Sequence, residues 1–312
     1  MSGTRVGTVL FCILAALAVL GLGTAAQADA ITHGGTTINM DFVTVNNAGN
    51  TADDTGYGPV AYKYRIGKYE VTAAQWAAVQ AADSNVGNAG WWSGSQPTAG
   101  TTWHEAAKFS NWLTTGSANS GYYTISGGEA TPNALGHDAY AAAHGTTYFI
   151  PTENEWYKAA YHKNNGVTGG ASNYWEYPTG SDSVPVGIRN PQVPAFDAVF
   201  SDWYNQGHPN DVTNAGVASP YSTIGQGGNV WEWNETAIGS SRGLRGGYWG
   251  TATPPHFLLA ASYRSDGRYP TYEYDGVIGF RVASSEAVPE PGSVAALLGI
   301  AVMGLIWRWR RK

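Results

Sequence analysis

The chain has only one cysteine among its 312 residues, Cys12. A single thiol excludes an intramolecular disulfide, a cysteine-ligated zinc site and an iron–sulfur cluster. Cys12 also lies within an apolar run, Val6 to Leu22, that is typical of a secretory signal peptide. Removal of that run would leave a mature protein without any cysteine.

Charged residues are also scarce, at 13% of the chain against roughly 25% in an ordinary globular protein. Five of the 17 Lys and Arg lie in the terminal segments, so the body of the chain is acidic. An acidic body repels phosphate, which excludes nucleic acid as a partner. The 43% hydrophobic content is enough to fill a core, while 41 Gly, 13 Trp and 19 Tyr favour a loop-rich fold over a helical bundle.

Both termini are typical of export. Arg5, the apolar run and then Ala26-Gln27-Ala28 predict a signal peptide over residues 1–28, cut by signal peptidase after Ala28. A retained membrane anchor is the alternative. At the other end, the apolar stretch from Gly292 to Trp307 precedes five residues of which four are basic. This stretch is just long enough for a transmembrane helix, with the basic tail held in the cytoplasm.

Val288-Pro289-Glu290-Pro291 stands directly before that stretch. Residues 288–312 as a whole resemble the PEP-CTERM sorting signal of exopolysaccharide-producing Gram-negative bacteria. The resemblance implies an inner-membrane tether through the C-terminal helix and then processing by an exosortase near Pro289-Glu290-Pro291. The processed protein would be periplasmic, outer-membrane or extracellular. The alternative is a plain tail anchor.

The body of the chain has no charge run, proline-rich linker or internal repeat, so we predict one domain. Residues 60–71 alternate near period two and predict a strand. Thr72, Thr102 and Thr152 are each followed three residues later by Gln or Glu, which predicts three helices that begin at capping boxes. Segments 244–249 and 277–282 predict strands that pair with each other in a small antiparallel sheet.

Five motifs stand in order: Tyr69-Glu70-Val71-Thr72, residues 149–156 (FIPTENEW), residues 228–233 (GNVWEW), Leu244-Arg245-Gly246-Gly247 and Gly279-Phe280-Arg281. This series resembles the formylglycine-generating enzyme family, also called sulfatase-modifying factor. The resemblance implies an α+β domain over residues 36–283 with a C-type-lectin-like core, rich in loops, with short helices and small antiparallel sheets. Members of that family oxidise a sulfatase cysteine to formylglycine with copper and dioxygen, and hold structural calcium.

The sequence departs from this family at the catalytic position. In the enzymes a cysteine pair lies between the RGG motif and a downstream arginine, here Arg264; an ungapped alignment puts Thr251 and His256 there. Cu(I) selects thiolate or thioether ligands, so we expect neither copper nor the family's oxidation. The alternative is a formylglycine-generating oxidase with an unrecognised site. His256 is either a single metal ligand or a packed side chain.

The resemblance also implies calcium ligands. One ion would bind the carbonyls of Gly228 and Val230 and the carboxylate of Glu232, although Gly225 replaces an Asn or Asp of the enzymes. Calcium takes about 6–8 oxygens, so the loss of one side chain would weaken this site. The alternative is an ion pair of Glu232 with a buried arginine such as Arg245. A second ion would use Asp197 and Asp211, with the carbonyls of Ala198 and Thr213.

Segment 262–276 (SYRSDGRYPTYEYDG) combines flat rings with planar cations, beside the position where the enzymes bind substrate. Such groups form binding surfaces for peptides or sugars. The candidate ligand-binding residues are Tyr263, Arg264, Arg268, Tyr269, Tyr272 and Tyr274; the alternative is a loop whose tyrosines pack inward. Arg245 and Arg281 are expected to satisfy carbonyls and carboxylates inside the fold. The sequence therefore predicts an exported, envelope-associated, non-catalytic module that binds a peptide or exopolysaccharide; a structural matrix protein is a further alternative.

Overall fold

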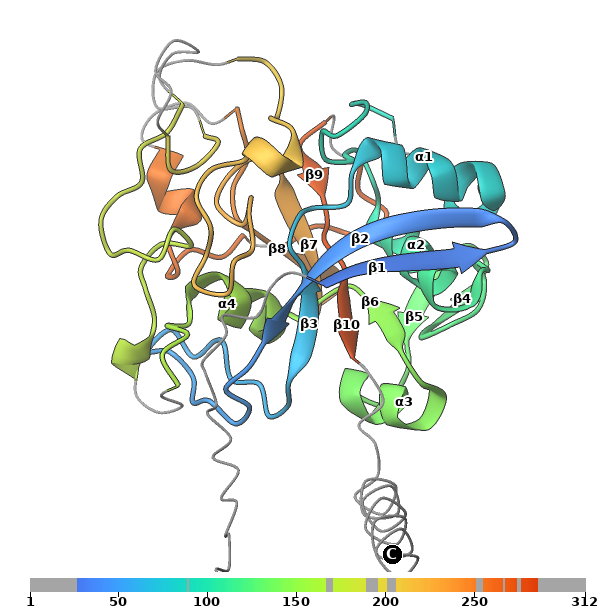
Figure 1. Ribbon diagram of the computed structural model, residues 1–312, viewed down its shortest axis with the longest axis horizontal. Coiled ribbons are helices and arrows are strands. Elements are labelled where there is room, and N and C mark those ends of the chain that lie inside the picture. Colours follow the sequence, from blue (N-terminus) through green and yellow to red (C-terminus); the bar gives the residue numbers. More distant parts are fainter. Residues whose placement is uncertain are drawn as a thin grey trace, which may run out of the picture.

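A five-stranded sheet joins the two ends of the described chain (Figure 1). The computed structural model describes residues 27–88, 90–166, 171–188, 196–200, 206–250, 255–265, 267–273 and 276–285. The strand order is β1 (Gln27–His33), β2 (Thr36–Val45), β3 (Tyr64–Gly67), β10 (Ala283–Ser285) and β6 (Thr147–Phe149), with every pair antiparallel. The sheet therefore begins before residue 36, and the predicted cleavage after Ala28 falls inside β1.

The β1–β2 hairpin turns through Gly34 and Gly35, whose φ angles of 56° and 87° suit residues without a Cβ. Ile31 pairs with Ile38 in this hairpin, and both side chains are buried. β3 is shorter than the strand predicted over residues 60–71, because the chain bends at Lys68 and Tyr69 and its backbone then bonds to other segments. The amide of Lys68 donates to Asp41 and that of Val71 to Phe280.

The three predicted capping boxes are confirmed. Helices α1 (Ala73–Ala82), α2 (Trp103–Thr115) and α4 (Glu153–Tyr161) each begin after a threonine whose hydroxyl accepts from the third helical amide, while Gln or Glu bonds back to the threonine amide. A further helix, α3 (His137–His144), follows Gly136 and has no side-chain cap. α1 lies along β2, and α2 lies against β6 (Figure 1).

A second sheet of three strands has β7 (Trp231–Ile238) at its centre. β8 (Ser241–Arg245) pairs with it antiparallel, and β9 (Ile278–Gly279) pairs with it parallel. The prediction that segments 244–249 and 277–282 pair with each other is therefore wrong, because β7 lies between them. The strands β4 (Tyr123–Ser126) and β5 (Glu129–Pro132) form a separate hairpin.

Stacked aromatic rings fill the core between the main sheet and the helices. Trp76 and Phe109 stack with centroids 5.5 Å apart, and Phe280 meets both rings edge-on. Five tryptophans are fully buried: Trp76, Trp103, Trp112, Trp156 and Trp233. Much of the remaining chain is loop and short 3-10 turns, at Ser84–Val86, Ala171–Asn173, Val212–Asn214 and Pro255–Leu259. This mixture confirms the predicted α+β, loop-rich fold with small sheets.

The predicted signal peptide up to residue 26 and the predicted sorting segment over 288–312 lie outside the described residues. Among the helices that the structure does describe, none has the length and apolarity to cross a bilayer.

Candidate functional site

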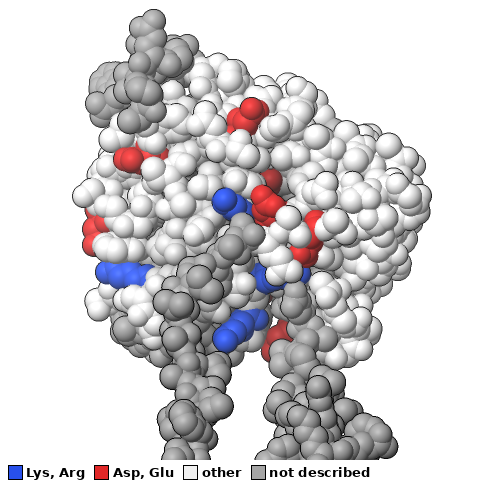
Figure 2. Space-filling model, in the orientation of Figure 1, with Lys and Arg blue, Asp and Glu red and all other residues white. Residues whose placement is uncertain are grey.

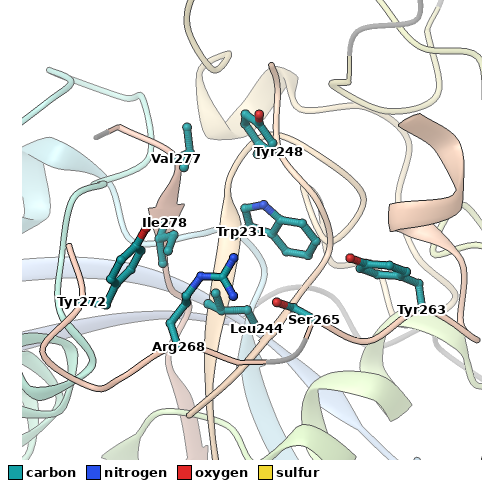
Figure 3. Close-up of a pocket in the computed structure, with 9 residues that line it drawn as sticks. All are labelled: Trp231, Leu244, Tyr248, Tyr263, Ser265, Arg268, Tyr272, Val277 and Ile278. Atoms are coloured by element: carbon teal, nitrogen blue, oxygen red, sulfur yellow. The ribbon is translucent and has the colours of Figure 1, made fainter. Parts of the chain in front are cut away.

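A hollow of about 240 Å³ lies where the starts of β7 and β9 meet the loop over residues 263–273 (Figure 3). Trp231 opens β7 and pairs in parallel register with Ile278 of β9, so both side chains are fixed by the sheet. β8 adds Leu244 beside them. The nine lining residues are Trp231, Leu244, Tyr248, Tyr263, Ser265, Arg268, Tyr272, Val277 and Ile278.

Aromatic rings form the walls of this hollow. The Trp231 ring lies 6.5 Å from that of Tyr248 and 6.2 Å from that of Tyr263, at interplanar angles of 31° and 36°. On the other side, the guanidinium of Arg268 lies 5.8 Å from the centre of the Tyr272 ring. Figure 3 shows Arg268 pointing into the hollow from the loop. Arg268 is the only charged group among the nine lining residues.

Backbone contacts hold the loop that carries Arg268. Its amide and carbonyl exchange two hydrogen bonds with Arg242 of β8, of 3.0 and 2.8 Å. The preceding Gly267 has φ 80°, and a Cβ there would lie 2.8 Å from the Arg242 carbonyl oxygen, so this close approach requires glycine. Further along, the amide of Trp103 donates to the Pro270 carbonyl at 3.0 Å. The loop is therefore fixed to β8 and to the start of α2.

Three of the six predicted ligand-binding residues line the hollow, namely Tyr263, Arg268 and Tyr272. Arg264 instead binds Glu153 at 2.7 Å. Tyr269 is 62% exposed and is not among the lining residues, and Tyr274 lies outside the described residues. Sequence reasoning missed Trp231 and Tyr248 as site residues, although each stands in or beside a recognised motif, GNVWEW and LRGG.

Two buried carboxylates, Glu153 and Glu232, bind three arginines at the floor of the site. Arg245 and Arg264 both bind Glu153, and Arg245 also donates to the carbonyls of Ala261 and Tyr263. Glu232, directly after Trp231, takes two hydrogen bonds of 2.6 Å from Arg281 and one of 2.7 Å from the Trp156 indole.

Arg281 also donates to the carbonyls of Gly67 and Ile224. Both Arg245 and Arg281 thus serve inside the fold, as predicted. The partner of Glu232 is Arg281, however, and not Arg245, because Arg245 is taken by Glu153.

Comparison with known proteins assigns this arrangement to a family. Residues 58–286 match the sulfatase-modifying factor enzyme 1-like domain. The chain belongs to the sulfatase-modifying factor family. Residues 287–312 match the PEP-CTERM protein-sorting motif, which marks the chain as an exported, envelope-sorted protein processed by exosortase-type sorting. No curated protein matches the chain.

Solved structures with a similar fold include CarF, with 21% identity and a TM-score of 0.54 over 78% of this chain and 97% of that one. Treponema denticola variable protein 1 is 22% identical, with a TM-score of 0.48 over 82% of this chain and 98% of that one. At this identity the likeness to CarF concerns the fold alone.

The sulfatase-modifying factor family implies calcium, and the oxygens at Glu232 do not fit it. Both carboxylate oxygens already accept from Arg281, whose guanidinium supplies the cation that calcium would bring. Gly228 and Val230 are buried beside this pair. Burial, and then repulsion by Glu232, raises the pKa of the neighbouring Glu70 well above its ordinary value. Its Oε1 is buried without a described hydrogen-bond partner, and either a proton or a cation would neutralise it.

The other implied metal ligands have different surroundings. Asp197 accepts a hydrogen bond of 2.8 Å from the Val186 amide, and Asp211 is exposed before the 3-10 turn over Val212–Asn214. His256 lies half-buried in the turn over Pro255–Leu259, and Thr251 lies outside the described residues. Over the described ranges, no three His, Cys, Asp or Glu side chains gather closely enough to hold a metal ion. Calcium at Asp197 and Asp211 stays a prediction.

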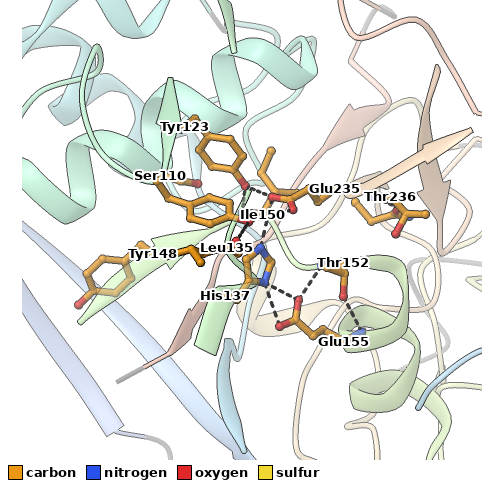
Figure 4. Close-up of polar contacts among 12 residues, drawn as sticks. Ser110, Tyr123, Leu135, His137, Tyr148, Ile150, Thr152, Glu155, Glu235 and Thr236 are labelled. Carbon is orange, nitrogen blue, oxygen red and sulfur yellow. Dashed lines mark hydrogen bonds and ion pairs between the residues drawn. The ribbon is translucent and has the colours of Figure 1, made fainter. Parts of the chain in front are cut away.

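A buried histidine links α3, α4 and β7 (Figure 4). His137 contacts Glu155 at 3.0 Å and Glu235 at 3.3 Å, and its ring stacks on Phe149. Burial by itself would lower the pKa of His137, but attraction by Glu155 and then Glu235 outweighs it and raises the pKa to about 10. Glu235 also accepts a hydrogen bond of 2.7 Å from the Tyr123 hydroxyl. Every polar atom of the ring has a partner inside the protein, so this cluster braces the fold and presents no reactive group.

Proposed function

We propose that this member of the sulfatase-modifying factor family is a non-catalytic binding module that works outside the inner membrane. Its ligand would occupy the hollow at Trp231. The observation that carries the proposal is the lining of the hollow, which combines four aromatic rings with the guanidinium of a fixed loop. The only cysteine of the chain is Cys12. Peptides and the exopolysaccharide of the cell envelope are the candidate ligands.

The absence of thiolates argues against oxidase activity. Family-type chemistry uses a copper ion held by two cysteines, and Cu(I) prefers sulfur ligands. Cys12 lies in the predicted signal peptide, so the mature chain would offer no sulfur except in methionine. A hydroxyl at Thr251 and an imidazole at His256 are harder ligands and do not replace two thiolates.

The lining instead suits recognition. Tyrosine, tryptophan and arginine supply much of the binding energy at protein interfaces, because they combine a large contact area with polar groups. On the face of the molecule that Figure 2 shows, most of the surface is uncharged, and the charged side chains of both signs lie partly next to one another near its centre. In Figure 1, β9 at the hollow lies in the upper half, and β10 lies lower and ends above α3.

Binding is tested with the purified full-length chain on glycan and peptide arrays, followed by titration calorimetry with the ligands retained. We expect Arg268→Ala and Tyr272→Ala to weaken binding at least tenfold. Tyr269→Ala is the matched control, because this residue lies in the same loop but outside the lining, and it should bind as the wild type does. Equal affinities for all three variants would show that the hollow is not the site.

Catalysis is tested separately with copper, dioxygen, a reductant and a sulfatase-type cysteine peptide, using mass spectrometry to detect the aldehyde. We expect no product above a copper-only blank, beside an active enzyme of the family. Aldehyde formation above that blank would overturn the non-catalytic proposal. A chain that binds nothing on either array but assembles into polymers would favour the structural matrix alternative.

A further inference from the structure

The sorting motif follows the folded domain after a very short stretch of chain. Strand β10 ends at Ser285, and Pro289-Glu290-Pro291 begins after only three further residues. An extended chain spans at most about 3.3–3.6 Å per residue, so three residues span about 10 Å. A cut at this motif would therefore bring the exosortase-type enzyme up against the surface around the end of β10.

The folded domain cannot lengthen this tether by releasing β10. The strand lies between β3 and β6 in the main sheet, and all three of its residues are buried. Arg65 of β3 donates to the Ser284 hydroxyl at 3.1 Å, and Phe280, shortly before the strand, is fully buried in the core. Peeling β10 away would break its pairing on both sides and expose that core. The tether therefore stays three residues long while the sheet is intact.

Helix α3 lies at the end of β10. It contacts both β10 and β6, and Figure 1 shows it directly below the point where β10 ends. Its inner side buries His137, Tyr140 and Ala141. The outer side, which we call the α3 face, consists of exposed residues in and just before the helix: Leu135, Asp138, Ala139, Ala142, Ala143 and His144.

The α3 face carries little charge and mostly small side chains. Asp138 is its only carboxylate, and it has no Lys or Arg. Leu135 is 45% exposed, although leucine is usually buried. Alanine loses no rotamer freedom when a partner covers it, and the cores of protein interfaces are depleted of charged residues. In a chain whose body is acidic, this face therefore suits close contact with another protein.

We infer that the exosortase-type processing enzyme docks on the α3 face while the three-residue tether delivers the motif to its active site. The short tether sets where the enzyme must lie, and the α3 face is the uncharged surface at that place. This inference concerns sorting and does not depend on ligand binding at the hollow.

Processing kinetics test the inference in cells that carry the exosortase, by pulse-chase of the full-length chain with mass spectrometry to detect loss of the C-terminal segment. Ala139→Glu combined with Ala143→Arg covers the α3 face with two long side chains, yet this pair at i and i+4 supports the helix. We expect the half-time of processing to rise at least about fivefold. Ala77→Glu with Ala81→Arg, at exposed alanines of the same spacing on α1, is the matched control and should process as the wild type does.

A longer tether separates docking from a general defect. Ten Gly and Ser residues inserted after residue 286 would add a flexible span of roughly 16–19 Å, so we expect them to restore the α3 variant to within about twofold of the wild-type rate. Leu135→Glu, outside the helix, should show the same loss and rescue, and it tests the face even if the double variant does not fold. Unchanged processing of both variants would overturn the inference, and so would slow processing that the insertion does not rescue.

Cross-linking identifies what covers the α3 face. A photoreactive amino acid at Ala142 should form an adduct with the exosortase, recognised by its peptides in mass spectrometry, whereas the same group at Ala81 should not. Adducts with lipid alone would mean that the bilayer covers the helix and would overturn the enzyme as the partner. The absence of any adduct would indicate that the motif is cut before the sheet closes, which also contradicts docking. None of these results bears on the proposed binding function.

Discussion

Replacing Arg281 with methionine is the sharpest test of the ionic floor beneath the hollow. Methionine keeps an unbranched stem of similar length but removes the charge and all five donors. Glu232, which is fully buried, would then retain only the indole of Trp156 as a partner. The carbonyls of Gly67 and Ile224 would also lose the guanidinium donors that they accept from in the wild type.

The expected cost follows from the burial of both charges. Breaking a buried pair by removing one partner costs about 3–5 kcal/mol, since the other charge is left uncompensated. The orphaned carbonyls place Arg281→Met in the upper half of that range. For a protein of this size, 1 kcal/mol lowers the melting temperature by roughly 2–4 °C. We therefore expect the melting temperature of Arg281→Met to lie about 8–20 °C below that of the wild type.

The assay is urea and thermal unfolding of the full-length chain, arranged as a double-mutant cycle. Glu232→Gln should also destabilise the fold, because it leaves the buried charge of Arg281 without its carboxylate partner. The double variant should cost less than the sum of the two single changes, since it removes both charges. Arg268→Met, at an exposed arginine, should change stability by less than about 0.5 kcal/mol. A cost below about 1 kcal/mol for Arg281→Met, or strictly additive costs in the cycle, would refute the pairing argument.

Three further predictions concern pH, helix capping and calcium. The pKa of His137 is raised in the folded protein, so its charge stabilises the fold fully below pH 6.5, and this stabilisation is lost as the pH rises toward about 10. In urea unfolding at pH 6, 8 and 10, the difference in unfolding free energy between the wild type and His137→Gln should therefore shrink as the pH rises. A difference that stays constant would contradict this prediction. Thr102→Ala removes a capping box and should cost about 1 kcal/mol in the same assay. Millimolar calcium should raise the melting temperature of Arg281→Met more than that of wild type, whereas a wild-type rise abolished by Asp211→Ala would assign calcium to the second predicted site.

Features that depend on a few neighbouring residues could be predicted from the sequence. The helix starts at Thr72, Thr102 and Thr152 followed from a hydroxyl and a Gln or Glu three residues apart, and all three exist as predicted. The motif series likewise identified the family. Pairing between distant strands left no such local signal: β8 and β9 each read as a short strand behind glycine, but nothing in either showed that β7 would separate them.

The candidate site was only partly predictable for the same reason. Residues 262–276 stood out because their rings and cations are close in sequence, and three of them do line the hollow. The role of Arg264 depends on Glu153, which lies 111 residues away, so composition alone made it look like a ligand-binding group. Trp231 and Tyr248 lie in or beside motifs that served to identify the family, and the sequence carries no local signal that their rings face a common hollow.

Arg264 and Arg268 lie four residues apart in one loop, yet the structure gives them opposite roles. Arg264 makes three hydrogen bonds to Glu153, whereas Arg268 points into the hollow and donates to the Gly267 carbonyl beside it. Arg264→Ala should therefore cost about 1–3 kcal/mol of stability, since Glu153 keeps Arg245, and should affect binding only through the fold. Arg268→Ala should leave the melting temperature unchanged and weaken binding. If Arg264→Ala reduced the affinity for the ligand without lowering stability, Arg264 would be a ligand-binding residue and this assignment of roles would be wrong.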